Sequence, residues 1–586
     1  MSTGSSFKPS LPRREIAVWC FAALLLFAVR VHMEQGPRLG NDSYEYLSVA
    51  ANFAAGHAGY TSIVYYDEER SHGVIPAPVT TFPIGYPAAI AAIAATGIER
   101  EYAALAVGVL SSLALIPLFV AAATFMEAPG WFVRVALLLL VVNSSYIIRA
   151  SFVMTEPLFT AVTMAAVTAF AGAIRYDRPG KARILLLLLG SLFLGLAFWV
   201  RYAGLFLFVG TALFFGWEWL RRRTSGSFAP LPCLSVAALI IGMGLLRNQL
   251  VAGAWMGGNS KHPDTSVVAL LKGLAVSIHE LLVGKGTLAT LAGVVIVLLL
   301  LAAARELLRG GSARRTANAL YRDSIFRYLA LYVVISCCAL IYLGLTSPIS
   351  IDSRMLHPLL PVILLLCLSG WLHIGGGAGN PPRTSALTRA AFVVICIVYA
   401  GANLQPALTP SPQSPHLFMA GRLGRPLSDG QSAMSWIDRN IPRDATILTT
   451  DGMATGYLLQ RPTVSLAWPW YSEAQWTETE VRETMERFSA AFLILSFRTV
   501  WPDPAVANSA FLSGLRSGPF PPWLELRAEN DEIKIFSLRS TGAHGYGGAA
   551  MWRRGHEWAQ LYRVRQHSLD RRKKKWARST VPTPHH

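Results

Sequence analysis

The chain has 586 residues, of which 53% are hydrophobic and 15% are charged. Soluble chains carry about 25% charged residues, so this composition excludes an ordinary soluble protein and predicts a membrane protein. The formal net charge of +18 then indicates cytoplasmic loops rich in Lys and Arg before it indicates nucleic acid. All six cysteines fall in apolar stretches, which predicts buried small side chains and no disulfide framework.

Long apolar stretches predict helices that cross the membrane, because one crossing takes about 20 mostly apolar residues. We predict about eleven such helices and therefore a multi-span transmembrane domain over residues 1–405. The N-terminal stretch lacks a small-residue cleavage site and is expected to remain as the first helix. The predicted spans are 16–33, 102–126, 131–149, 155–175, 183–200, 202–220, 231–250, 286–308, 328–346, 356–374 and 389–405.

Lys and Arg gather in alternate loops between the predicted spans. With the N-terminus in the cytoplasm these loops all lie inside, as the positive-inside rule requires. An odd number of crossings then places everything after residue 405 outside. We therefore expect a multi-pass membrane protein with a cytoplasmic N-terminus and an exported C-terminal part. The loops that carry these basic residues are 8–14, 175–183, 221–223, 305–327 and 383–389.

The first outer loop, residues 34–101, is long and contains two apolar segments that are too short to cross. Residues 43–56 predict an amphipathic helix that ends at Gly56, and a second helix is predicted over 84–95. Short apolar helices of this kind lie in the plane of the membrane interface. The loop is thus predicted to cover a site at the membrane surface. The alternative is a structural cap over the helix bundle.

Asp42 lies just after the first apolar stretch. A carboxylate held close to hydrocarbon is costly and is a candidate for function. Asp42 with Glu45 three residues later is also a helix-start pattern, in which a side-chain cap has a reciprocal partner. The two interpretations are compatible, and the local sequence leaves both open.

Four isolated arginines fall at predicted outer helix ends, against the charge bias of the loops. A single arginine there can extend to the lipid headgroups, which is a sufficient explanation for any one of them. Four together favour a phosphate-binding role, because the planar guanidinium fork matches a phosphate group. These residues are Arg149, Arg201, Arg247 and Arg354.

The composition changes after a Pro-rich linker at 405–415. Strand-like and helical segments then alternate, which predicts a small exported α/β domain over residues 416–545. It holds no catalytic constellation, so acceptor binding is its expected role. The segment 551–586 is basic, and we expect it to be disordered and to contact anionic lipid or glycan.

Several short motifs, taken in order, resemble those of the GT-C superfamily of membrane glycosyltransferases. The similarity is closest to the bacterial branch that includes the protein mannosyltransferase-like and aminoarabinose transferase-like enzymes. Each motif is weak alone, but their order and shared sidedness cover residues 15–375. The motifs are Asp42-Ser43-Tyr44-Glu45-Tyr46 with Asn52 and Gly56, Phe82-Pro83-Ile84-Gly85-Tyr86-Pro87, Thr155-Glu156, Arg201 with Gly204, Arg247-Asn248 with Gly253, and Arg354-Met355 with Pro358.

The resemblance implies an α-helical integral membrane protein with a GT-C-like bundle and the small exported α/β domain. It implies transfer of a sugar from a polyprenyl-phosphate carrier to an acceptor on the outer face of the membrane. In an inverting attack Asp42 would be the general base, and the four arginines would bind the departing phosphate. Glu45, Tyr46, Tyr86 and Glu156 would position substrate. For Glu156 the alternative is an acid that favours a helix N-terminus.

The sequence departs from the family pattern in two places. A single carboxylate stands where mannosyltransferase members often carry an Asp-Glu pair, which leaves the acceptor unassigned. No Asp-x-Asp pair is present, so no metal site and no cofactor are expected, although a divalent ion at Asp67–Glu69 stays open. The expected partners are the polyprenyl-phosphate-linked sugar donor, membrane lipid and an acceptor glycan, lipid or protein, without nucleic acid.

Two other classes of function compete with this prediction. A lipid or glycan flippase or transporter should show inverted repeats and polar interruptions near the middle of the membrane. The polar residues here gather instead at one predicted face. A non-catalytic envelope assembly protein remains an alternative if Asp42 is only a helix cap.

Overall fold

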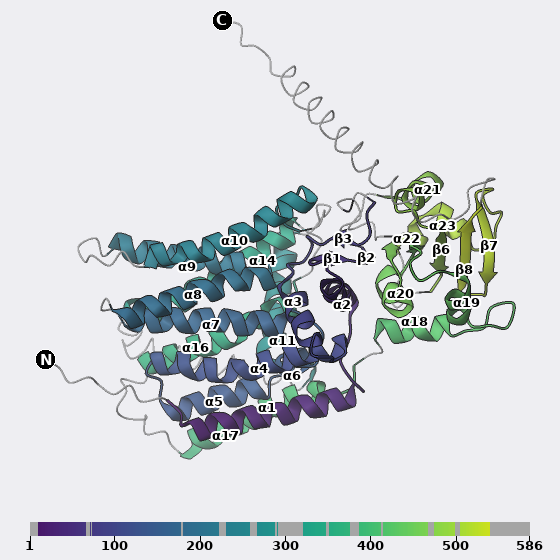
Figure 1. Cartoon of the computed structure of the whole chain (residues 1–586). Coiled ribbons are helices and arrows are strands. Elements are labelled where there is room, and N and C mark those ends of the chain that lie inside the picture. Colours follow the sequence, from purple (N-terminus) through teal and green to yellow (C-terminus); the bar gives the residue numbers. More distant parts are fainter. Residues whose placement is uncertain are drawn as a thin grey trace, which may run out of the picture. The chain divides into compact units, whose positions relative to one another are not determined.

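Figure 1 shows the computed structural model of the chain. The chain consists of two compact units, and each is described by itself. The first comprises Met1–Ser43, Phe82–Leu250 and Ser260–Pro412, and the second comprises Tyr44–Thr81, Val251–Asn259 and Gln413–His586. The structure describes residues 10–65, 71, 73–176, 180–221, 230–257, 266–287, 290, 293, 320–346, 351–374, 386–411, 414–466, 474–498 and 504–539. Most of the predicted span 286–308, the acids 67–69 and the basic tail lie outside these ranges.

The first unit is made of helices. Within the described residues, six of them are long and apolar enough to cross a membrane, or seven if the bent pair α5 and α6 is one span. The chain is thus a multi-pass membrane protein, and the count of about eleven crossings stays a prediction. The helices are α1 (Arg13–Met33), α3 (Gly85–Ala94), α4 (Arg100–Phe125), α5 (Gly130–Val141), α6 (Ser144–Ala150), α7 (Glu156–Arg175), α8 (Lys181–Val200), α9 (Gly204–Arg221), α10 (Pro230–Ala252), α11 (Val267–Val283), α14 (Ser324–Thr346), α15 (Ser353–Leu356), η1 (His357–Leu359), α16 (Leu360–Ile374) and α17 (Ala386–Ala407).

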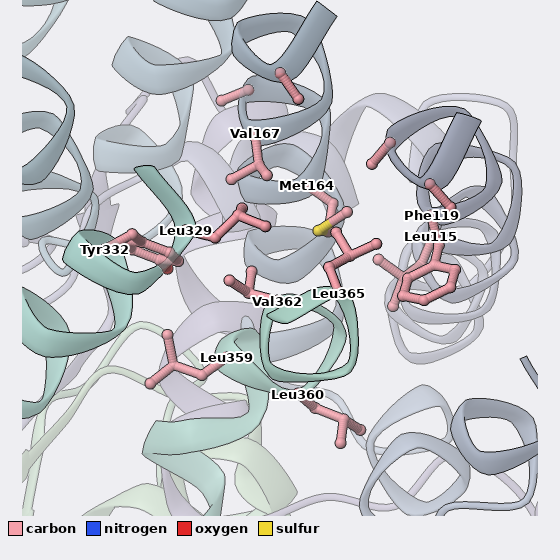
Figure 2. Packing of buried hydrophobic residues seen from close by; sticks show 14 of the residues in the cluster. Leu115, Phe119, Met164, Val167, Leu329, Tyr332, Leu359, Leu360, Val362 and Leu365 are labelled. Carbon is pink, nitrogen blue, oxygen red and sulfur yellow. The ribbon is translucent and has the colours of Figure 1, made fainter. Parts of the chain in front are cut away.

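Helix α7 lies in the middle of this unit. In its most apolar stretch of 18 residues, 78% of the residues are buried, compared with 17% in the corresponding stretch of α1. It packs between α4 and α8, which run beside it in Figure 1. Its many Ala and Thr residues and Gly172 allow this close approach, as small side chains do between membrane helices. Figure 2 shows Met164 and Val167 of α7 among Leu115, Phe119, Leu329 and Leu365 from three neighbouring helices.

The single span predicted over 131–149 is broken in the structure. Helices α5 and α6 meet at an angle of 58°. Asn143 begins α6, because its side chain accepts a hydrogen bond from the Tyr146 N–H at 3.2 Å. Its amide also donates to the Leu281 carbonyl at 2.8 Å, so a tertiary contact fixes the break. An Asn at a helix start stabilises a new helix direction, and here it redirects the segment that carries Arg149.

The second unit contains a six-stranded sheet of order β2-β5-β4-β6-β8-β7. Strands β2, β5, β4 and β6 are parallel neighbours, and β8 and β7 continue the sheet antiparallel. The strands are β2 (Ile63–Val64), β4 (Ile447–Thr449), β5 (Thr463–Ser465), β6 (Phe492–Ser496), β7 (Leu524–Glu529) and β8 (Ile533–Leu538), and a separate antiparallel pair joins β1 (Tyr60–Thr61) to β3 (Ala77–Pro78).

Side chains alternate between the two faces of the sheet, as the pleat requires. Leu448 and Leu493 pack on one face, while Ile447 and Ile494 pack on the other. The first face is covered by α21 (Glu478–Arg487) and α23 (Ala510–Gly514), and the second by α18 (Pro415–Leu423), α19 (Ala433–Asn440) and α20 (Gly452–Leu459). Strand β2 comes from the long first loop, which is far from residues 416–545 in sequence. The boundaries 416–545 of the α/β domain stay a prediction.

Candidate functional site

The start of helix α2 (Asn41–Ala54) is fastened to the segment that enters α7. The Ser43 hydroxyl donates to the Val153 carbonyl at 2.7 Å and accepts from the Gly40 N–H at 2.9 Å. Two backbone bonds between Arg38 and the same segment reinforce the attachment, at 3.1 Å and 3.0 Å. The first turn of α2, which carries Asp42, therefore has a fixed position relative to the N-terminus of α7.

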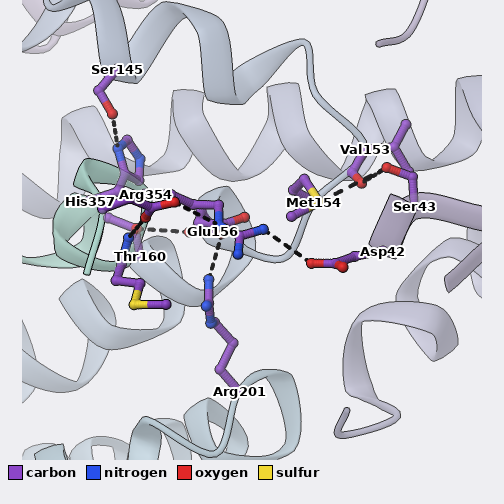
Figure 3. Close-up of polar contacts among 12 residues, drawn as sticks. Asp42, Ser43, Ser145, Val153, Met154, Glu156, Thr160, Arg201, Arg354 and His357 are labelled. Atoms are coloured by element: carbon purple, nitrogen blue, oxygen red, sulfur yellow. Dashed lines mark hydrogen bonds and ion pairs between the residues drawn. The ribbon is translucent and has the colours of Figure 1, made fainter. Parts of the chain in front are cut away.

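Glu156 is the buried centre of the site. It stands in the first turn of α7, and its side chain is 0% exposed. Its Oε1 atom lies 2.7 Å from an Arg201 terminal nitrogen and 3.6 Å from Arg354 Nε, as Figure 3 shows. A buried carboxylate needs such compensation, and the helix N-terminus adds to it. Glu156 is thus an acid at a helix N-terminus, as the alternative considered for it states, and it also pairs with two arginines.

Arg354 links Asp42 to this buried carboxylate. One of its terminal nitrogens donates to Asp42 Oδ2 at 3.1 Å, and its Nε lies 3.7 Å from Asp352 Oδ2. Asp352 in turn begins α15 by accepting from the Met355 N–H. The Asp42 side chain is 19% exposed, so it borders solvent while Glu156 does not. The site is a chain of charges from a surface carboxylate to a buried one.

The helix start near Asp42 differs from the predicted cap. Helix α2 already begins at Asn41, so Asp42 lies inside the first turn. The bond that closes the helix start joins Gly40 and Ser43. The Asp42 carboxylate meets Arg354, a partner 312 residues away that local sequence could not indicate.

Arg149 is a cation in this neighbourhood without a carboxylate partner. Its guanidinium lies 5.8 Å from the centre of the Phe152 ring, and its Nε is buried without a hydrogen bond. The carboxylates of Glu156 and Asp352 and the guanidinium of Arg354 influence it electrostatically. Within the described ranges, Arg149 forms no ion pair with either carboxylate. A buried charge without hydrogen bonds is unfavourable, so an anionic ligand here would complete its contacts.

Arg201 occupies the tight turn predicted between two spans. Helix α8 ends at Val200 and α9 begins at Gly204. A Cβ atom at Gly204 would stand 2.4 Å from the Phe198 nitrogen, so the chain can turn here only with glycine. The turn presents Arg201 to Glu156 at the end of the helix pair.

Tyr86 of α3 also belongs to this neighbourhood. It is fully buried, and burial together with the nearby Glu156 carboxylate raises the pKa of its hydroxyl, which therefore stays protonated. The adjacent Gly85 explains how α3 reaches this place, because a Cβ there would stand 2.5 Å from the Trp199 carbonyl oxygen. The Gly-Tyr-Pro motif thus combines a close backbone contact with a buried hydrogen-bonding group.

The other predicted site residues lie elsewhere. Arg247 donates to the Asn248 side chain at 3.0 Å, and Asn248 donates to the Tyr202 hydroxyl at 2.8 Å. Arg247 therefore lies close to the turn that carries Arg201. No contact found among the described residues joins Arg247 to Glu156. Glu45 and Tyr46 are buried residues of the second unit, one turn further along α2.

Sequence reasoning missed His357 and Ser145. His357 is buried, and its Nδ1 atom lies 3.1 Å from the Ser145 hydroxyl of α6, next to the arginines of the site (Figure 3). The two residues are 212 positions apart. His357 lies within the motif Arg354-Met355 with Pro358, which gave it no role, and Ser145 lies in none of the motifs. Within the described residues no three His, Cys, Asp or Glu side chains form a group that could hold a metal ion.

Comparison with known proteins places this geometry in context. Residues 94–240 match the family model of dolichyl-phosphate-mannose-protein mannosyltransferase. No curated protein matches the chain. Among solved structures, ArnT from Cupriavidus metallidurans bound to undecaprenyl phosphate is similar, with 14% identity, 91% of this chain and 100% of that chain covered, and a TM-score of 0.52.

Two further structures share the fold. The arabinofuranosyltransferase AftD from Mycobacteria has 16% identity, with 92% of this chain and 40% of that chain covered and a TM-score of 0.52. The Archaeoglobus fulgidus oligosaccharyltransferase tethered to an acceptor peptide has 12% identity, 82% and 69% coverage, and a TM-score of 0.50. Similarity at this level shows a common fold.

The chain has the fold of membrane glycosyltransferases of the GT-C superfamily, and residues 94–240 match a model of protein mannosyltransferases that use a lipid-phosphate-linked sugar. The part that matches the protein mannosyltransferase model runs from the end of α3 to the middle of α10. The superfamily resemblance found in the motifs is therefore confirmed.

Proposed function

We propose that this protein transfers a sugar from a polyprenyl-phosphate carrier to an acceptor at the outer face of the bacterial cytoplasmic membrane. The transfer inverts the anomeric carbon, and Asp42 is the general base. The observation that carries the proposal is the charge chain from Asp42 through Arg354 to Glu156 and Arg201, beside Arg149, which has no ion-pair partner among the described residues. The fold shared with ArnT bound to undecaprenyl phosphate supports the choice of carrier.

The donor phosphate would bind at Arg149. This guanidinium has free donors, and a phosphate accepts them in a planar fork. Arg354 and Arg201 both contact Glu156 and would share the charge that grows on the phosphate as the sugar leaves. Fixed cations at that point stabilise the transition state more than the ground state. Arg247, beside Tyr202, completes the proposed donor-binding set from the same end of the unit.

Asp42 would then act on the acceptor. A phosphate that draws Arg354 toward itself would release Asp42 Oδ2 from its 3.1 Å bond, and the carboxylate would accept the proton of an attacking hydroxyl or amine. Base and phosphate would lie on opposite sides of the sugar, as an in-line attack requires. Donor binding would thus prepare the base, because the same arginine serves both groups.

The remaining residues would hold the substrates. Glu156 would position the two arginines, and the protonated Tyr86 hydroxyl would donate to the sugar or its phosphate. Glu45 and Tyr46 follow Asp42 on α2 and would contact the acceptor, which is a glycan, lipid or protein. No step of this mechanism uses a metal ion.

The test compares Asp42→Asn with wild type in a membrane assay that uses radiolabelled sugar on polyprenyl phosphate. Asn keeps the size of the side chain and can still accept from Arg354, but it cannot take a proton. We expect turnover to fall about 10²–10⁴-fold, the usual contribution of a positioned base. Thermal stability in detergent should hardly change.

Two controls make the result specific. Glu45→Gln should be far milder, because it leaves the proposed base in place. Asp352→Asn removes an exposed carboxylate from Arg354 without touching Asp42, and it should keep most of the activity. Near-wild-type turnover in Asp42→Asn would exclude Asp42 as the base.

A further inference from the structure

We propose that three arginines of the second unit, Arg422, Arg425 and Arg498, form a subsite for an anionic group, carboxylate or phosphate, on an acceptor glycan. The inference deepens the proposed function, on which it rests, by assigning a chemical class to the acceptor. Its evidence comes from the second unit alone.

The three guanidiniums converge on one buried carboxylate. Glu532 is 8% exposed, and its carboxylate pairs with Arg422 near the end of α18. Its Oε1 atom also lies 2.8 Å from a terminal nitrogen of Arg425 and 3.5 Å from one of Arg498. The residues come from three separate segments, so the tertiary fold gathers them.

The charges of this cluster do not balance. Three guanidiniums face one carboxylate, which leaves an excess of two positive charges. Burial and the nearby cations Arg425 and Arg498 lower the pKa of Arg422. Asp531 directly precedes Glu532, but it forms no ion pair in the part of the chain that the structure describes. A second anion would be attracted to this place.

The exposed arginines can receive such an anion. Arg425 is 52% exposed and Arg498 is 67% exposed, whereas Arg422 is largely covered and stacks 4.8 Å from the Phe418 ring. Arg422 therefore serves to hold Glu532, and Glu532 orients the other two. Each of those keeps guanidinium donors that face water, and a pair of such forks suits a carboxylate or a phosphate.

The position in the sheet supports a binding role. The chain runs from β4 to β5 on one side and then to β6 on the other side of β4, so the order reverses between β4 and β6. Ligands of open parallel sheets bind outside the carboxyl ends of the strands at such a reversal. Arg498 follows the carboxyl end of β6, and Glu532 lies beside it, since the Phe497 N–H donates to the Glu532 carbonyl at 2.9 Å.

A purely structural ion-pair network would explain Arg422 and Glu532. It would not need two further arginines that stay more than half exposed, because exposed pairs add only about 0–1 kcal/mol each. The two accounts predict different behaviour of Arg425 and Arg498, which can be changed without disturbing the buried pair.

The experiment titrates the full chain, held in phosphatidylcholine nanodiscs, with fluorescently labelled hexagalacturonate as an anionic glycan and with labelled maltohexaose as its neutral counterpart. We expect wild type to bind the anionic probe only, and more weakly at high salt. The double variant Arg425→Gln with Arg498→Gln should bind it at least about tenfold more weakly, as loss of two charge-assisted contacts implies. Inorganic pyrophosphate should compete with the probe in wild type.

The matched control is Arg482→Gln, which removes an equally exposed arginine of the same unit, 55% exposed and paired with Glu486 on α21. Its affinity should equal that of wild type. Equal affinity in all three proteins, or equal binding of maltohexaose, would overturn the proposal. A phosphatidylglycerol-rich nanodisc forms the lipid arm: if it abolishes probe binding, lipid headgroups occupy the arginines and the glycan subsite is rejected.

Binding in this assay needs no turnover, so the two proposals fail separately. Asp42→Asn should bind the anionic probe as wild type does. Loss of turnover with intact binding supports the proposed base, whereas intact turnover in Asp42→Asn with normal probe binding rejects the base and leaves the subsite standing.

Discussion

At the scale of single residues, the arginines of the first unit differ in what they already bind. Arg201 and Arg354 both contact the buried Glu156, so removing either leaves that carboxylate poorly compensated. Breaking a buried pair costs about 3–5 kcal/mol, and such variants would mix loss of folding with loss of binding. Arg149 has no carboxylate partner among the described residues, which makes it the cleaner probe of donor binding.

We therefore expect Arg149→Gln to raise the apparent KM for the polyprenyl-phosphate sugar while kcat changes less. One hydrogen bond to a charged group contributes about 1.5–3 kcal/mol, which corresponds to about 10–150-fold in affinity. Arg149→Lys should recover part of the loss, because it keeps the charge but not the fork. Initial rates over a range of donor concentrations measure both constants.

The control for this prediction is Arg134→Gln, which removes an arginine of α5 that pairs with Glu15 at 2.7 Å and is about half exposed. It should leave the donor KM unchanged. If the donor KM of Arg149→Gln equals that of Arg134→Gln, the donor phosphate does not bind at Arg149.

At the scale of elements, the site depends on how helices turn and break. The turn between α8 and α9 presents Arg201, and the break between α5 and α6 directs the segment that carries Ser145 and Arg149. A buried network holds that break, since Asn403 accepts from the Ser144 N–H at 3.0 Å and donates to the Val283 carbonyl at 3.0 Å. Three helices far apart in sequence are thereby joined at the base of the site.

Gly204→Ala should destabilise the protein and lower its activity. The added Cβ would meet backbone atoms of α8 at 2.4 Å, so the turn must shift, at a cost of about 1–3 kcal/mol. Melting in detergent should start at a lower temperature, and the donor KM should rise because Arg201 moves with the turn.

Gly216→Ala is the matched control on the same helix, because a Cβ there meets nothing within 4 Å. Alanine is favoured over glycine inside a helix by about 0.5–1 kcal/mol, so this variant should melt at the wild-type temperature or slightly above. Equal stability of the two variants would show that the turn at Gly204 tolerates a side chain.

At the scale of the whole molecule, the distribution of Lys and Arg predicts on which side of the membrane each end of the chain lies. The site residues Glu156, Arg201 and Arg354 come from three different loops, and the structure gathers them, so these loops lie on one side of the first unit. The loops with many basic residues alternate with them. We expect a reporter enzyme fused after Pro415 to be active only in the exported compartment.

A second reporter at residue 178, in a loop with several basic residues, is the control and should be active only in the cytoplasm. If the fusion after Pro415 were active in the cytoplasm, the number of crossings before it would be even, and the proposed outer location of the acceptor would be wrong.

The sequence by itself determined the class of this protein, because local chemistry carries that information. Apolar stretches such as 102–126 and 155–175 correspond to α4 and α7, since the lipid environment selects any stretch long and apolar enough to cross. The motifs around Asp42, Glu156 and Arg201 predicted a candidate site for the same reason. Each occurs at a helix start or turn, where short-range geometry restricts the residues that fit.

Only the tertiary structure decided which of these residues meet. The bond between Asp42 and Arg354 and the contact of His357 with Ser145 join positions far apart in the chain. The break at Asn143 and the strand β2 taken from the first loop are of the same kind. A single sequence shows which groups are costly to bury, whereas packing alone decides which partner offsets that cost.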